Sequence, residues 1–186
     1  MTKLISAALA LVLATSATGC GGSGWRPTHP EPASSPLGAT SEAAETLARF
    51  QERDPSLRRF VDEAYAVAVF SSVGKGAMAI GGAHGKGEVY ERGQLVGTTR
   101  LTQLSVGLAL GGQAYSELIF FRDKAALDDF KSGNFELGAQ ASAVAVTAGA
   151  STDASYENGV AIFTLPKAGL MYEAAVAGQK FSFSPM

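Results

Sequence analysis

The chain has 186 residues, a formal net charge of −2 and only 17% charged residues. This balance excludes a protein that binds nucleic acid through a strongly basic surface. Because the chain has one cysteine, it cannot form an internal disulfide. Glycine is abundant, with 22 residues. The high content of small residues favours strands that approach one another closely over a helical bundle.

The first twenty residues predict export. Lys3 precedes an apolar run over 4–14, and small residues follow it, which is the order of a signal peptide over 1–19. The apolar run is too short for a membrane-spanning helix. The residues that end at Cys20 resemble a bacterial lipobox, in which this cysteine is acylated, although Ala17 stands where leucine is commoner. The alternative is an ordinary signal peptide that happens to be followed by a cysteine.

An acylated Cys20 predicts an exported chain that is anchored to the cell envelope by lipid. Gly21 is compatible with the outer membrane of a two-membrane cell, facing the periplasm or the cell surface, because aspartate at this position is the usual signal for the inner membrane. Residues 20–39 are rich in Gly, Ser and Pro, which predicts a flexible tether. A single domain is then expected over 40–186.

Two short amphipathic helices are predicted at the start of this domain. Ala43, Leu47 and Phe50 recur at the spacing of one helix face. Pro55 disfavours helix at the preceding residue but suits the first position of a new helix, which Asp54 can cap. A second apolar stripe follows at Leu57, Phe60, Val61 and Ala64.

From Ala66 onward the period of two predicts a series of strands, with a tight turn at Arg92-Gly93. One short helix is expected among them, capped by Asp123 and ended by Gly133. Glycines inside the strands indicate bulges, bends or close backbone approach. The predicted fold class is α+β: a curved antiparallel sheet, or a small barrel or sandwich, with a few short flanking helices.

Two segments of the strand region echo each other. The sequence VAVFSSVGKGAMAIGGAHGKGEVY, from Val67, aligns without a gap with VAIFTLPKAGLMYEAAVAGQKFSF, from Val160. Phe70 then aligns with Phe163, and two glycines, Gly76 and Gly85, align with Gly169 and Gly178. One interpretation is a pseudo-symmetric sheet built from two related hairpins; the other is chance similarity between strands of small residues.

Several motifs in a fixed order resemble one family, the SYLF domain, also called Ysc84-like or DUF500. These are AVAVFSSVGKGAMAIGGAHGKGEVY, then LSVGLALGGQAYSELIFF, then a short helix and GVAIFTLPKAGLMYEAAVAGQKFSF. The resemblance covers about Leu57 to the C-terminus. It implies a binding module that is not an enzyme and has no cofactor. Eukaryotic members bind phosphoinositide-containing membranes, fungal members also bundle actin, and bacterial relatives are thought to bind lipid.

In some members of the family, the segment before the sheet is an amphipathic basic helix that contacts the membrane. Here the matching region, 41–65, contains Arg49, Arg53, Arg58 and Arg59. Arginine side chains match phosphate geometry well, so these four are candidates for binding lipid headgroups. The same region carries even more acidic residues, and the alternative is a solvated helix face above a core-packing stripe.

Lys75 is a further candidate contact for anionic lipid, within Gly74-Lys75-Gly76. The alternative is an ordinary lysine in a solvated turn. A phosphate-binding loop is not indicated, because such a loop opens a helix and the pattern here continues at period two.

The sequence predicts neither a metal site nor a catalytic centre. His29 lies in the tether, and no second ligand accompanies His84 at a recognisable spacing. Ser105 is not part of a nucleophile elbow. The expected function is therefore non-enzymatic binding of membrane phospholipids by a lipid-anchored envelope protein. The alternatives are a structural or protein-interaction module whose lipid contact is confined to Cys20 and, less in keeping with strands rich in Ala and Gly, a membrane-spanning barrel.

Overall fold

A computed structural model describes residues 41–133, 136–137 and 143–186. All of them belong to one compact unit, Pro32–Met186. The predicted signal peptide, Cys20 and the whole predicted tether lie outside the described residues. No helix in the described part is long and apolar enough to cross a membrane.

The helices at the start of the domain confirm the prediction. Helix α1 spans Ser41–Arg53, a 3-10 turn (η1) spans Pro55–Leu57, and α2 spans Arg58–Glu63. The Asp54 carboxylate accepts a hydrogen bond from the backbone N–H of Ser56, so Asp54 is the expected cap. The helix that follows Asp54 differs from the expected one only because its first residues form a 3-10 turn.

Three long strands make up most of the sheet: β1 (Ala66–Glu91), β2 (Gln94–Phe121) and β5 (Val160–Pro185). β2 lies in the centre and pairs antiparallel with both others. The shorter strands predicted separately are therefore continuous parts of these three. β3 (Glu136–Leu137) and β4 (Ala143–Ala145) add to β5, and β4 does so in parallel.

Two local predictions are also confirmed. The β1–β2 turn is at Arg92-Gly93, where both residues have positive φ, 48° and 81°. Helix α3 spans Lys124–Ser132; the Asp123 side chain caps its start and Gly133, at φ +78°, ends it.

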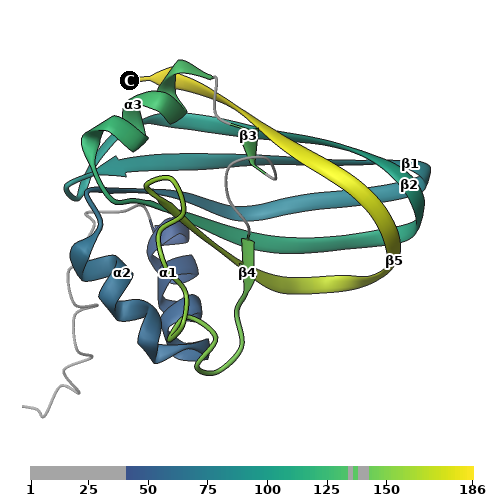
Figure 1. Ribbon diagram of the computed structural model, residues 1–186, viewed down its shortest axis with the longest axis horizontal. Coiled ribbons are helices and arrows are strands. Elements are labelled where there is room, and N and C mark those ends of the chain that lie inside the picture. Colours follow the sequence, from purple (N-terminus) through teal and green to yellow (C-terminus); the bar gives the residue numbers. More distant parts are fainter. Residues whose placement is uncertain (1–40, 134–135, 138–142) are drawn as a thin grey trace, which may run out of the picture. The chain divides into compact units, whose positions relative to one another are not determined.

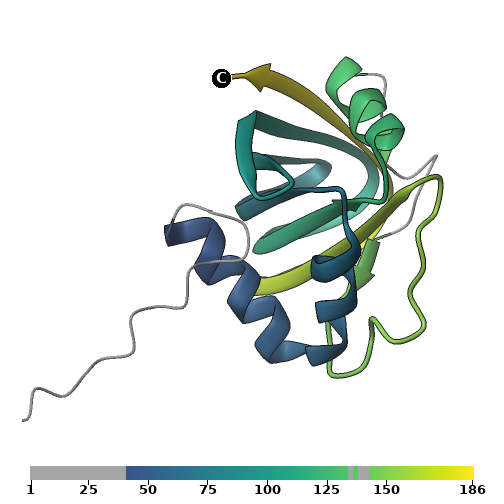
Figure 2. The same ribbon diagram turned by 90° about the vertical axis from the view of Figure 1, so that its left-hand side faces the viewer.

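The three long strands run away from the helices, bend together and return (Figure 1). One ribbon of strands thus supplies two layers, which curl toward each other without closing (Figure 2). At the bend, Met78 pairs with Leu110 but Ile80 pairs with Val106, so β2 takes the longer path. We call residues 66–73, 115–121 and 160–165 the first layer, and residues 82–90, 97–104 and 178–184 the second layer.

The two halves of β1 meet where the layers come together. A Cβ on Gly87 would lie 2.8 Å from the Phe70 ring and 2.9 Å from the carbonyl oxygen of Val69. Only glycine allows this approach, so the expectation of close backbone contact is confirmed at Gly87. It does not hold at Gly74 and Gly76, where a Cβ would meet nothing within 4 Å.

Two clusters of buried side chains form the core. The interior cluster lies between the layers, where Phe70, Ile119 and Phe181 pack with Leu127 and Phe130 of α3. The outer cluster lies on the other face of the first layer. There α1, η1 and α2 bury the predicted stripes against the sheet through Ala43, Leu47, Phe50, Leu57 and Phe60.

The internal echo does not place aligned residues at equivalent positions. β1 and β5 do flank β2 symmetrically, yet Phe70 pairs with Glu117 and Phe163 pairs with Leu118. Because successive strand residues face opposite sides, Phe70 enters the interior cluster and Phe163 the outer one. The two segments also share one central strand, so they do not form two separate hairpins.

Candidate functional site

The four helix arginines differ in their contacts. Arg49 donates to Thr46 Oγ1 at 3.0 Å, and Arg53 is exposed. Arg58 forms an exposed ion pair with Asp62 at 3.6 Å, which is worth little.

Arg59 has a structural role. Its guanidinium donates to the carbonyl oxygens of Ser151 (2.7 Å) and Ala154, and it lies over the Phe60 ring, 4.7 Å from the centroid. This side chain fastens the segment before β5 to α2.

Lys75 lies within β1, opposite Gln113 of β2, and is partly exposed. The interpretation of Gly74-Lys75-Gly76 as a turn is therefore wrong. The strand continues through these residues because the real turn comes later, at Arg92-Gly93.

The outward side of the second layer carries a group of cations that the sequence analysis did not single out. Alternate residues of the three strands form four ladder rows on this side. From the bend toward the helices, the rows are Gly82–Leu104–Gly178, His84–Thr102–Lys180, Lys86–Arg100–Ser182 and Glu88–Thr98–Ser184. We call these twelve residues the basic face. Lys86, Arg100 and Lys180 are exposed on it, and Glu88 is its one carboxylate.

Lys86 and Arg100 occupy directly opposite positions in the β1–β2 ladder. Opposite strand positions bring Cβ atoms to about 5 Å, and like charges placed there destabilise a sheet. Neither side chain has an ion-pair partner among the described residues. Glu88 is nearby, but its carboxylate accepts a hydrogen bond from the Tyr90 hydroxyl at 2.6 Å. The basic face thus keeps two adjacent cations that an external anion could neutralise.

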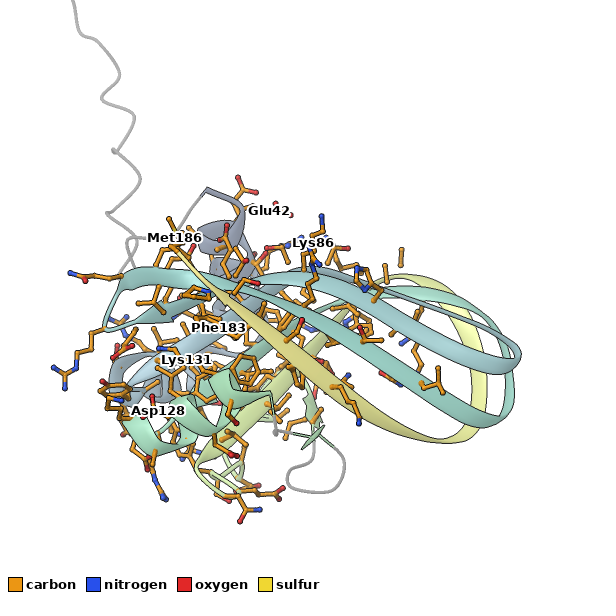
Figure 3. The ribbon with its side chains drawn as sticks, turned by 90° about the horizontal axis from the view of Figure 1, so that it is seen from above. Glu42, Lys86, Asp128, Lys131, Phe183 and Met186 are labelled. Atoms are coloured by element: carbon orange, nitrogen blue, oxygen red, sulfur yellow. The ribbon has the colours of Figure 1, made fainter. Side chains whose placement is uncertain are left out.

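A groove adjoins this pair, with a cavity volume of about 660 Å³. It is lined by Lys86, Arg100 and His84 on the second layer, by Ser71 and Ser72 on the first, and by Glu42 of α1, among others. Figure 3 shows Glu42 and Lys86 on the same side of the sheet, away from α3.

A β-bulge shapes one wall of this groove. Ser71 and Ser72 together oppose Ser116, because Phe70 pairs with Glu117 and Val73 pairs with Tyr115. The Ser71 carbonyl accepts from Ser116 Oγ (2.7 Å) and Lys167 Nζ (3.2 Å). The bulge therefore gives the wall polar groups that a regular ladder would have used in pairing.

Sequence reasoning missed this face because its residues are far apart in the chain and single within each strand. A signal was present, however. Lys86, Arg100 and Lys180 each border a stretch of strand with few or no charged residues. The strand register is needed to see that the three come together.

A buried polar cluster lies between the layers. Gln179 Nε2 approaches Gln103 Oε1 and Tyr115 Oη, both at 3.2 Å, and Glu117 Oε2 at 3.4 Å. Glu117 is 0% exposed, and its Oε1 has no partner among the described residues. Burial raises the pKa of Glu117 to about 8, against a small opposing effect of the Gln179 hydrogen bond. This cluster is enclosed, so it is less suited than the basic face to receive a ligand.

Comparison with known proteins is consistent with the resemblance. Residues 102–184 match the family model Ysc84, described as "Las17-binding protein actin regulator". "Beta cell expansion factor A" of Aeromonas veronii is 31% identical over 137 residues. The chain is a member of the Ysc84-like (SYLF) family.

The matched regions are partial. The family model covers most of β2 and nearly all of β5, and so includes Leu104 and Lys180 of the basic face. The Aeromonas alignment covers 73% of this chain and 52% of the relative, so the matched part is about half the length of that protein.

Proposed function

We propose that this SYLF-family protein is a non-enzymatic lipid-binding domain of an exported, membrane-anchored lipoprotein. Its basic face binds the phosphate groups of phospholipid headgroups. The opposed, exposed Lys86 and Arg100 are the observation that carries the proposal. Covalent attachment of lipid at Cys20 keeps the domain at the envelope.

Charge explains why phosphate suits this site. A phosphate between Lys86 and Arg100 replaces a repulsion with two charge-assisted hydrogen bonds, and the arginine can bind it through two N–H groups at once. The whole chain has a net charge of −2, so attraction to an anionic surface depends on this local excess of positive charge.

The helix surface of Arg49, Arg53, Arg58 and Arg59 is the competing site for headgroups. Its arginines alternate with acidic residues, and Arg59 is engaged with Ser151 and Ala154. These features favour the basic face. Lys75 shares the strand side of Val73, which packs in the interior cluster, so Lys75 is not part of that outward face.

The family description favours a second candidate function, protein interaction, because it names binding to the protein Las17. In that case the domain binds a protein partner at the envelope, and lipid contact is confined to the acylated Cys20.

Two charge-matched double variants distinguish these possibilities. Both are made in the full chain with Cys20→Ser, so that no acyl chain is attached. One carries Lys86→Gln and Arg100→Gln, and the other carries Arg53→Gln and Arg58→Gln. Each is sedimented with phosphatidylglycerol or phosphatidylcholine vesicles at low and high salt.

We expect the parent chain to bind phosphatidylglycerol vesicles more strongly than phosphatidylcholine vesicles. Only the first double variant should lose this preference. If only the second variant loses the preference for phosphatidylglycerol, the headgroups bind at the helix arginines instead. A folded parent chain that binds neither vesicle would overturn lipid binding and leave the protein-interaction function.

A further inference from the structure

Leu104 is an exposed apolar residue on the basic face. Its side chain is 67% exposed, and in the described residues the other large hydrophobic side chain with high exposure is the terminal Met186. Its neighbours in the ladder row are Gly82 and Gly178. Because neither glycine has a side chain, Leu104 projects from this row alone.

The strands beyond Leu104 carry very few charges. β2 has none between Arg100 and Glu117, and in β1 Lys75 and Lys86 are the nearest ones on either side of the bend. In β5, Glu173 is the one charged residue between Lys167 and Lys180. Cations therefore border the bend on all three strands, as they border the apolar part of many interfacial membrane proteins.

The fold limits how deep this end can enter a membrane. The sheet is not closed, and open strand edges leave backbone N–H and C=O groups that hydrocarbon cannot satisfy. A shallow position at the boundary between headgroups and acyl chains avoids this cost. Leu104 lies four residues from Arg100, or about 13 Å along an extended strand, so both can contact one leaflet.

We propose that the domain binds a phospholipid bilayer with the bend of its strands toward the membrane, and that Leu104 enters the boundary of the acyl chains. This inference rests on the proposed lipid binding and adds an orientation and an apolar contact to it. The opposite end, with α1, α2 and α3, faces away from the bilayer (Figure 1). The occupant is a bilayer and not a second copy of the chain, because cations border Leu104 on the face and an identical face would repel them.

Single-tryptophan variants test the orientation. The chain has one tryptophan, Trp25, which is replaced by Phe in the Cys20→Ser background. Leu104→Trp then reports from the bend side of the basic face. Gln94→Trp is the matched control, since Gln94 is also exposed on β2 but lies at the hairpin end. Both are mixed with phosphatidylglycerol vesicles whose acyl chains carry bromine, a contact quencher.

We expect vesicles to shift the emission of the Leu104→Trp chain to the blue and bromine to quench it, while the Gln94→Trp chain changes little. Vesicle binding with equal, weak quenching at both positions would overturn the inference and leave lipid binding standing. Absence of vesicle binding by both chains and by the parent would overturn both.

A charged substitution gives an independent measure. Leu104→Asp should weaken binding to these vesicles by on the order of tenfold more than Gln94→Asp, because both add the same charge and only the first opposes an apolar contact. Equal effects of the two substitutions would overturn the inference. So would a change in the oligomeric state of the Leu104→Asp chain in analytical ultracentrifugation without a change in vesicle binding.

Discussion

Two carboxyl groups are fully buried among the described residues, and they are held in opposite protonation states. Asp54, between α1 and η1, accepts hydrogen bonds from the N–H and hydroxyl of Ser56 and from the N–H groups of Gly149 and Ser151. Among the described residues, Glu117, between the layers, accepts a hydrogen bond only from the Gln179 amide, at 3.4 Å. Burial raises both pKa values, but the hydrogen bonds lower that of Asp54 to about 2, whereas that of Glu117 rises to about 8.

The comparison shows that donors, and not depth, decide the charge of a buried carboxyl. The two carboxyl groups also mark two regions of the sheet that are stabilised by different interactions. The outer region is joined by a polar contact between the helix end at Asp54 and the loop at Ser151. The interior depends on close packing, which Gly87 permits, and contains a polar cluster with few donors.

Titration of Glu117 is expected to give the largest effect. The native carboxyl keeps its proton up to about pH 8, while the unfolded one releases it near the ordinary glutamate pKa of 4.5. The unfolded state therefore binds fewer protons between these values, and the free energy of unfolding falls as pH rises, by on the order of 4 kcal/mol in all. Urea unfolding from pH 4.5 to 8 measures this slope, and Glu117→Gln should flatten it. An unchanged slope in that variant would show that Glu117 is ionised in the fold.

Replacement of Asp54 by Ala should cost about 3 kcal/mol, because it removes a cap and leaves the N–H groups of Gly149 and Ser151 without their acceptor. Thermal unfolding at pH 7 measures the loss, and Asp62→Ala, at an exposed helix position, is the control. The wild-type contribution of Asp54 should disappear as pH falls from 3.8 toward 2, opposite in sign to that of Glu117. Equal melting temperatures of the two variants would contradict the assigned role.

Replacement of Gly87 by Ala tests the packing of the interior. The added methyl would overlap the Phe70 ring and the Val69 carbonyl, so we expect a loss of about 2 kcal/mol. Gly74→Ala is the matched control on the same strand, because a Cβ there meets nothing within 4 Å. Denaturant midpoints compare the two, and a similar loss in both would mean that strand conformation, not contact between the layers, sets the requirement.

The smallest expected effect concerns the helix arginines. Arg59→Ala should lower stability by about 1 kcal/mol, since it removes the hydrogen bonds to Ser151 and Ala154. Arg58→Ala removes only the exposed pair with Asp62 and should leave the melting temperature unchanged within error. A larger loss of stability in Arg58→Ala than in Arg59→Ala would contradict the structural role assigned to Arg59.

Local features of the fold could be predicted from the sequence because they depend on neighbouring residues. The caps at Asp54 and Asp123, the end of α3 at Gly133 and the Arg92-Gly93 turn each follow from a few adjacent side chains. The curved α+β class also follows, from the change of period at Ala66.

Features that depend on register could not be predicted in this way. The folding back of three continuous strands is set by pairing shifts near Met78 and Ile80, which no single strand reveals. The same limit applies to the candidate site. The opposition of Lys86 to Arg100, and the placement of Leu104 between two glycines, exist only once the ladder is known.

The shared strands also bear on how the protein folds. In both layers, β1 and β2 belong to a single hairpin, whose turn, Arg92-Gly93, joins residues of the second layer. If β1 and β2 begin to pair at this turn, the first pairs close only short loops. Pairing must then extend through the bend before the first layer can form. β5 pairs along the same β2 and begins only after α3 in the chain. We therefore expect the second half of β1 and the first half of β2 to pair first, and the long-range pairing with β5 to be the slow step.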